Sequence, residues 1–276
     1  MSAAALARDG RLLAHAVLYE FRKVAAFRTG FVVREILRGL ARPLVTIAML
    51  QVIYAQHAGA EIGGYSRAEA VGYMILVAAF EAFVFHDRAL DLSEQIFQGY
   101  VTKFLVMPFR YFLLPLGRFV QFTLLQLAVS LALWSAGALA LPAVWPLPAS
   151  ALALAQSLLL ALLGSYCFLL FYFAVHSLAF WLDVVWSLLV MARFVSLFVA
   201  GAMLPVGMLP PGVRAAFEWC FPYWTIAAPI EIFLGRAGSA HFARGVAVLV
   251  ASALALEAVR RGLWRRGTAR YAGSGM

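Results

Sequence analysis

The residues able to do chemistry are few in this sequence, and they are scattered. Only 13 of the 276 residues are Asp or Glu, and 5 are His. The sequence contains no His-Glu-x-x-His pair, no Gly-x-Ser-x-Gly elbow and no Gly-x-x-x-x-Gly-Lys-[Ser/Thr] phosphate loop. Cys167 and Cys220 lie in different apolar regions and fit no metal or disulfide spacing. We therefore expect no catalytic residues and no metal site, and the chain itself cannot be an ATPase.

Two ionisable residues stand inside strongly apolar runs: Glu81 in VAAFEAFVF and Arg193 in LLVMARFVSLF. A charged group inside a membrane costs several kcal/mol unless it is paired or hydrated. We hypothesise that the two face a cavity or a second subunit and pair there. Phe80, Phe194 and Phe198 would then add an aromatic lining to a translocation path. The alternative is that Arg193 snorkels or pairs structurally, and that the aromatic residues only pack.

A polar stretch, LSEQIFQGYVTKFLVMPFRYF at 92–112, separates two of the most hydrophobic parts of the chain. Leu92 and Ile96 share one helical face, Gly99 can end that helix, and Pro108 permits a new direction. This pattern predicts a short helix that rests its apolar side on the protein and turns its polar side to a partner.

The elements that must position these residues are membrane helices. The chain is 64% hydrophobic and only 13% charged, whereas soluble domains are about one quarter charged. The formal charge of +9 comes from cations placed beside apolar segments. That placement is typical of the positive-inside bias and of contact with anionic lipid, and it does not favour nucleic-acid binding. We expect an all-α integral membrane protein with one transmembrane domain, 1–276.

A spanning helix needs about 20 mainly apolar residues. Six segments meet this need: 36–55, 68–85, 111–141, 149–175, 184–204 and 242–259. The segment 205–236 contains five prolines, which predicts short re-entrant helices on the extracytoplasmic side. Trp219, Tyr223 and Trp224 would lie there at headgroup depth, and water would reach Glu231. An additional span at 217–234 is the alternative.

The segment 11–28 precedes the first span and has an amphipathic pattern. Leu13, Val17 and Val24 recur on one face, with Arg11 and Arg22 on another. This spacing predicts a helix in the membrane interface. The alternative is that its cations serve only as a topology signal.

The orientation follows from the distribution of Lys and Arg. These residues are concentrated before the first span, in the connection 87–104 and in the tail 260–276. The positive-inside bias therefore predicts a multi-pass protein with cytoplasmic N- and C-termini and a cytoplasmic polar stretch.

The order Ile96, Gly99, Leu105, Pro108 resembles the signature of ABC-2 type transporter permeases, in a branch where such a segment precedes the third span. The run FPYWTIAAPIEIFLG at 221–235 also resembles that branch. The resemblance covers most of the chain through the combination of these motifs with six spans and an amphipathic entry helix.

This resemblance implies a partner. Such permeases pair as homodimers or heterodimers, and each binds a separate ATPase subunit that carries ATP and Mg²⁺. The segment 87–104 would be the coupling helix that contacts the ATPase. The candidate contacts are Arg88, Asp91, Glu94, Gln95, Gln98 and Gly99.

Export is the expected activity, and an aromatic path would suit a lipid-like, peptide or otherwise amphipathic substrate. An ion-gradient-driven transporter is an alternative, although no internal repeat supports it. An intramembrane enzyme or assembly factor for envelope polymers is another.

Overall fold

A computed structural model describes residues 3–26, 44–56, 61–85, 91–107, 110–140, 142 and 145–271. Helices account for almost all of the regular structure in these ranges. The described residues form no strand, and their β-type pairing is limited to an isolated bridge between Ile62 and Tyr65. The all-α class is therefore confirmed at this level. Arg88 and Pro108 lie outside the described residues.

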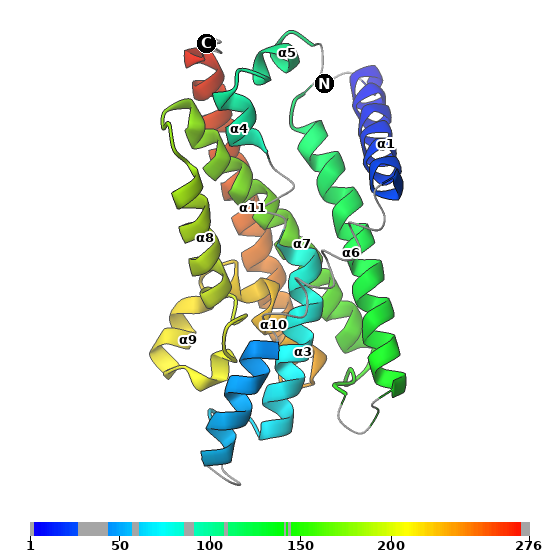
Figure 1. The fold of residues 1–276 in the computed structure, drawn as a ribbon, viewed down its shortest axis with the longest axis vertical. Helices are drawn as coiled ribbons and strands as arrows, with labels where there is room; N and C mark the ends of the chain where they lie inside the picture. The colour runs from blue at the N-terminus through cyan, green and yellow to red at the C-terminus, as the bar shows by residue number, and fades with distance from the viewer. Residues whose placement is uncertain are drawn as a thin grey trace.

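Three helices run along the long axis of the molecule (Figure 1): α6 (Leu113–Ala140), α7 (Ala151–Ser177) and α11 (Ser239–Arg270). Among the described residues these three are long and apolar enough to cross a membrane. α7 continues into the 3₁₀ turn η2 (Leu178–Phe180) and is the central helix. In its most apolar stretch 61% of the residues are buried, against 17% in α6 and 11% in α11.

Three shorter helices accompany them: Leu44–Gln56, α3 (Arg67–Val84) and α8 (Trp186–Val199). α3 begins in a capping box between Ser66 and Glu69. α8 is shorter than the predicted span 184–204. It ends because Gly201 adopts a φ of +70° and the amide of Ala202 bonds the Leu197 carbonyl, which closes the helix in a Schellman motif.

The segment 205–236 folds into short pieces: η3 (Val206–Met208), α9 (Pro211–Phe217), η4 (Tyr223–Thr225) and α10 (Ala227–Phe233). These breaks exclude the alternative continuous span at 217–234. Of the three aromatic residues predicted at headgroup depth, Tyr223 and Trp224 are fully buried within the protein, whereas Trp219 is exposed. Glu231 is also buried, because the whole of α10 packs into the protein beside α7.

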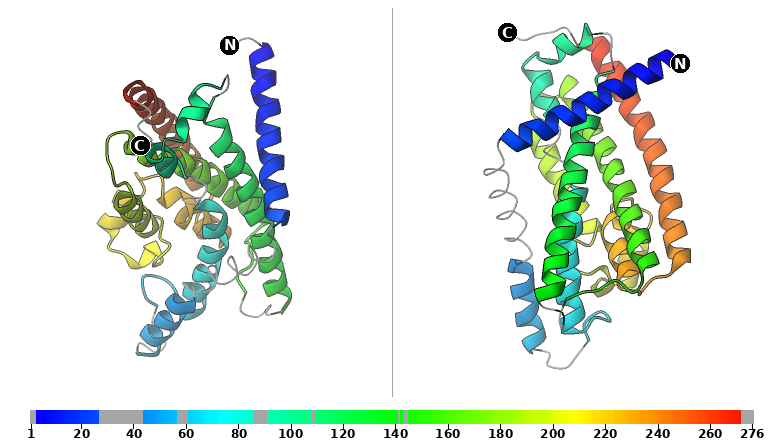
Figure 2. Two further views of the ribbon diagram at one scale, coloured as in Figure 1. Left: turned by 45° about the horizontal axis from the view of Figure 1, so that its top comes forward. Right: turned by 90° about the vertical axis from the view of Figure 1, so that its right-hand side faces the viewer.

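α1 (Ala3–Ala26) lies across α6 (Figure 2) and begins earlier than the predicted 11–28. Its half-buried face contains Leu13, Val17 and Val24, as the amphipathic pattern predicts. α11 also exceeds its prediction, because the expected tail continues as helix to Arg270. Glu257 bonds Arg260 and Arg261 one turn later, and such pairs support a continuing helix.

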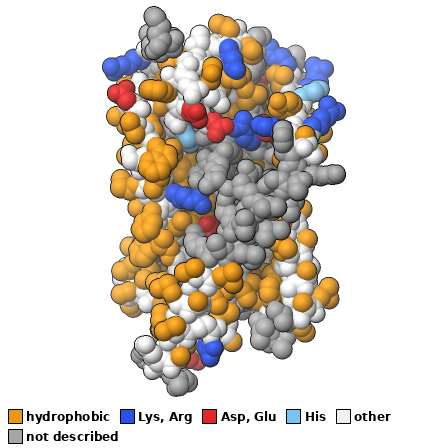
Figure 3. Space-filling view, in the orientation of Figure 1, with side chains coloured by type: hydrophobic (Ala, Val, Ile, Leu, Met, Phe, Trp, Pro, Cys, Tyr) orange, Lys and Arg blue, Asp and Glu red, His pale blue; other side chains and the backbone are white. Residues whose placement is uncertain are grey.

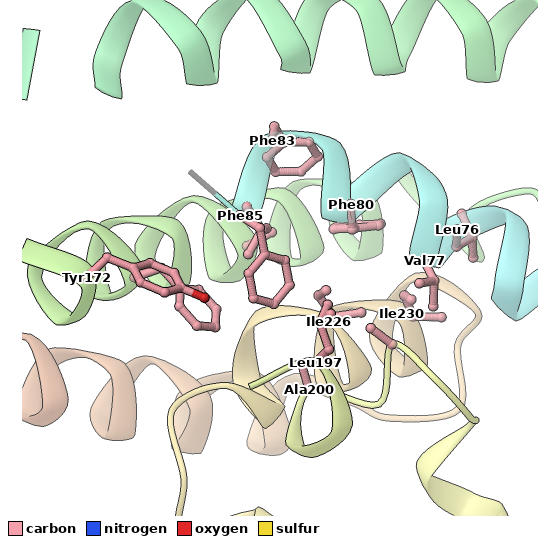
Figure 4. Packing of buried hydrophobic residues seen from close by; sticks show 14 of the residues in the cluster. Leu76, Val77, Phe80, Phe83, Phe85, Tyr172, Leu197, Ala200, Ile226 and Ile230 are labelled. Carbon is pink, nitrogen blue, oxygen red and sulfur yellow. The ribbon is translucent and has the colours of Figure 1, made fainter. Parts of the chain in front are cut away.

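The core forms where α3, α7, α8 and the segment around α10 meet (Figure 4). Val77 and Phe80 of α3 belong to the same buried cluster as Leu197, Ile226 and Ile230. Lys and Arg side chains gather at one end of the molecule, above a broad hydrophobic belt (Figure 3). That cationic end carries α4, α5 and the end of α11 (Figure 1).

Candidate functional site

The polar stretch forms two short helices at the cationic end, α4 (Leu92–Phe97) and α5 (Val101–Leu105). The predicted single segment 87–104 is therefore divided. Gly99 stands between the helices with a φ of +79°, a left-handed conformation that glycine adopts without steric cost. We call the pair α4–α5 the coupling segment, after the role that the sequence resemblance predicts for it.

The buried side of α4 is fastened to the long helices. Leu92 and Ile96 are buried as predicted. The Ser93 hydroxyl lies 2.9 Å from Nδ1 of His176, at the end of α7. The hydroxyl of Tyr271, next to the end of α11, donates to the Ile96 carbonyl at 3.2 Å. α4 is thus attached to two of the three long helices through its own residues.

Two further contacts attach α4 to α6. The Tyr111 hydroxyl donates to Oε1 of Gln95 at 2.8 Å, just before α6 begins. Nη1 of Arg118 in α6 lies 2.9 Å from Oδ2 of Asp91. The same guanidinium lies 3.4 Å from Glu20 in α1.

The outward side of the coupling segment is both polar and apolar. The Gln98 side-chain amide donates to Glu94 at 2.9 Å, and both residues are exposed. Beside them Phe97 is 68% exposed, Tyr100 55% and Val106 80%. Exposed aromatic and aliphatic side chains beside polar ones are typical of a protein–protein contact surface. We call Glu94, Phe97, Gln98, Tyr100 and Val106 the outward face.

The structure divides the predicted contact residues. Glu94 and Gln98 lie on the outward face, Asp91 and Gln95 are turned to the bundle, and Gly99 is the joint between α4 and α5. Sequence reasoning missed the exposed aromatic residues of the outward face. Phe97 follows Ile96 about 100° further round the helix, off the face shared by Leu92 and Ile96, and this spacing could have identified it.

The predicted pair is present within one chain. Nη2 of Arg193 in α8 lies 3.8 Å from Oε1 of Glu81 in α3. Phe80 is buried in the core, which favours packing for this residue, whereas Phe194 and Phe198 are exposed on α8. Within this chain the pair therefore links two helices, α3 and α8.

A second polar cluster lies at the opposite end. Arg214 of α9 and the Tyr223 hydroxyl each lie 3.2 Å from Oε2 of Glu231 in α10. Burial raises the pKa of the Glu231 carboxyl, and Arg214 opposes that shift. Glu218, next to α9, lies 2.9 Å from Arg244 of α11. These contacts hold the short helices against one another.

The model of a protein family described as ABC-2 family transporter protein matches residues 40–275. The chain belongs to the ABC-2 transporter family. No curated protein matches it. As an ABC-2 permease, it is a multi-pass membrane protein whose family implies an ABC ATPase partner. The coupling segment and the Glu81–Arg193 pair both lie inside the matched range.

Proposed function

We propose that this protein is the membrane subunit of an ABC exporter, and that the coupling segment docks on a separate ATPase subunit at the cytoplasmic face of the bacterial inner membrane. One observation carries the proposal: α4 is bonded to α6, α7 and the end of α11, yet presents an exposed outward face at the cationic end of the molecule. A movement imposed on that face would reach all three long helices.

The cationic end supports the orientation. Lys and Arg residues favour the cytoplasmic side, where anionic lipids attract them. Both α1 and the end of α11 lie at that end together with the coupling segment (Figure 1). This arrangement agrees with cytoplasmic termini. Six crossings would be formed by the helix Leu44–Gln56, α3, α6, α7, α8 and α11.

The mechanism follows from the fastening of α4. When two ATPase subunits close on ATP and Mg²⁺, each would push its coupling segment as a rigid body. Because Ser93, Gln95 and Ile96 bond different helices, the cytoplasmic ends of those helices would shift together. The energy would favour one of two packed states of the bundle, as differential contacts require.

A second permease, either a copy or a sister chain, would complete the translocation path. On α8, Phe194 and Phe198 are exposed close to the partly exposed Arg193. An apolar surface with one cation beside it suits a lipid-like, peptide or otherwise amphipathic substrate.

Co-purification with the cognate ATPase tests the docking. The variant Phe97→Ala combined with Glu94→Lys should lose the ATPase, because it removes a large apolar contact and reverses a charge on the outward face. Trp219→Ala is the matched control, since it removes a still more exposed aromatic residue (79%) far from that face. The control should retain the ATPase. Full retention by the outward-face variant, or transport by the permease without ATP, would refute the proposed function.

A further inference from the structure

We propose that Arg118 is a positioning residue of the coupling apparatus: it ties α1 to α4, so that the N-terminal helix moves with the coupling segment. The source of the movement rests on the proposed function. The tie itself rests on the contacts of three side chains.

Arg118 bridges two carboxylates from different elements. Its Nη1 lies 2.9 Å from Asp91 and its Nε 3.4 Å from Glu20. The guanidinium is a rigid fork of donors, which can hold two carboxylates at once, whereas an ammonium is a point charge. Both contacts lie at the wall of a cavity of about 450 Å³ between α1, α4 and α6.

Asp91 is committed to this bridge and not to its own helix. It occupies the N-cap position of α4, where an aspartate usually accepts a bond from the helix amides. Here the side chain makes no cap bond, and its carboxylate is directed to Arg118. Asp91 therefore connects elements at the expense of a local cap.

The carboxylates of α1 also point to the bundle. Asp9 lies 3.7 Å from Arg110, and Glu20 contacts Arg118 about three helical turns further along the same face. Arg11 and Arg22 of the same helix are exposed. Charge thus orients α1, with its acids on the bundle and these two cations away from it.

The helices cross closely beside the bridge. A Cβ on Gly117 would come within 2.7 Å of the Ala16 Cβ, so the absence of a side chain lets α1 approach α6 there. Arg118 is the next residue, and Glu20 lies one turn beyond Ala16 on α1. A close crossing places α1 where Arg118 can reach both carboxylates, so a displacement of α4 is transmitted to α1.

The test measures the distance between α1 and the coupling segment. The permease carries Cys220→Ser, with spin labels at Leu18→Cys on α1 and Thr102→Cys on α5, both exposed positions. In lipid nanodiscs without ATPase, the unaltered bridge should give one narrow distance distribution. Arg118→Gln should broaden it, and Arg118→Lys should recover it only in part. Arg22→Gln, which removes an exposed cation of α1, should leave it unchanged.

A distribution in Arg118→Gln as narrow as with Arg118 intact would overturn the tie. If Arg118→Gln does not fold, Glu20→Gln serves in its place, because it releases α1 and leaves the contact with Asp91. With the cognate ATPase trapped by ATP and vanadate, the distance between the labels should stay unchanged when Arg118 is present and lengthen in Arg118→Gln. If no ATPase binds the protein with Arg118 intact, the proposed function fails, and the nanodisc measurement still decides the tie. If the ATPase binds and vanadate trapping lengthens the distance equally with Arg118 intact, the coupled movement is refuted.

Discussion

The guanidinium of Arg193 lies 3.8 Å from the Glu81 carboxylate, and their side chains are only 31% and 18% exposed. A partly buried ion pair of this kind can stabilise the packing of two helices, contribute to the translocation path, or do both. Packing is favoured by its position between α3 and α8 of one protomer. Phe85 adds to the site, since its ring centre lies 5.8 Å from the guanidinium.

The pair makes a residue-scale prediction. Arg193→Leu removes the cation that lies 3.8 Å from the Glu81 carboxylate, whereas the double variant Glu81→Leu/Arg193→Leu removes both charges. Breaking a buried pair costs about 3–5 kcal/mol. Because the side chains are partly exposed, we expect a loss on the order of 1–2 kcal/mol for the single variant and recovery of much of it in the double variant. Thermal unfolding of the purified permease in detergent measures both.

Equal unfolding temperatures for the single and double variants would contradict the packing role. Transport by the complete complex gives the complementary result. If the double variant recovers stability but not transport, the pair also belongs to the translocation path.

At the scale of elements, the crossing of α1 over α6 depends on one missing side chain. Gly117→Ala should displace α1, because the new Cβ would overlap Ala16. Adding Ala16→Gly frees that space and should restore the crossing, at a cost of about 1 kcal/mol in helix propensity. Limited proteolysis of α1 in nanodiscs follows the displacement.

In that experiment Gly10→Ala is the matched control, since an added Cβ at this position meets nothing within 4 Å. Gly117→Ala should be cleaved faster than this control and faster than the compensated double variant. Equal cleavage of all three variants would mean that α1 is held without the close approach at Gly117.

Local signals predicted some elements well. α3, α6 and α7 lie close to the predicted spans because their apolar lengths and their neighbouring sequence determine their ends, as at the Ser66 capping box and the Ser150 cap. The early end of α8 was missed because its apolar run continues past Gly201. The sequence predicted the buried side of α4 but counted Asp91 and Gln95 among the contacts with the ATPase. These two side chains instead contact Arg118 and Tyr111, whose positions only the folded chain reveals.

At the scale of the whole molecule, the two ends differ in charge and in the helices that they carry. The coupling segment lies at the cationic end, and α9 and α10 lie at the other (Figures 1 and 3). In a Cys220→Ser background, Thr102→Cys should therefore react with a membrane-impermeant maleimide only after the cells are permeabilised. Gly212→Cys, where an added Cβ meets nothing within 4 Å, should react in intact cells.

The reverse labelling pattern would place the coupling segment outside the cell, where no ATPase could drive it. Labelling of both positions in intact cells would show a leaky preparation. Reaction of a known cytoplasmic protein with the impermeant maleimide in the same intact cells would identify such a preparation.

The central position of α7 limits the amino-acid substitutions that this protein can tolerate during evolution. Most other described elements pack on this helix, and a Cβ at Gly164 would overlap Thr225. A random-mutation library selected for export should therefore keep the inward positions of α7 nearly invariant. The exposed apolar positions of α11 should exchange more freely among apolar residues. Substitutions would then accumulate at the periphery of the molecule and be eliminated by selection at its centre.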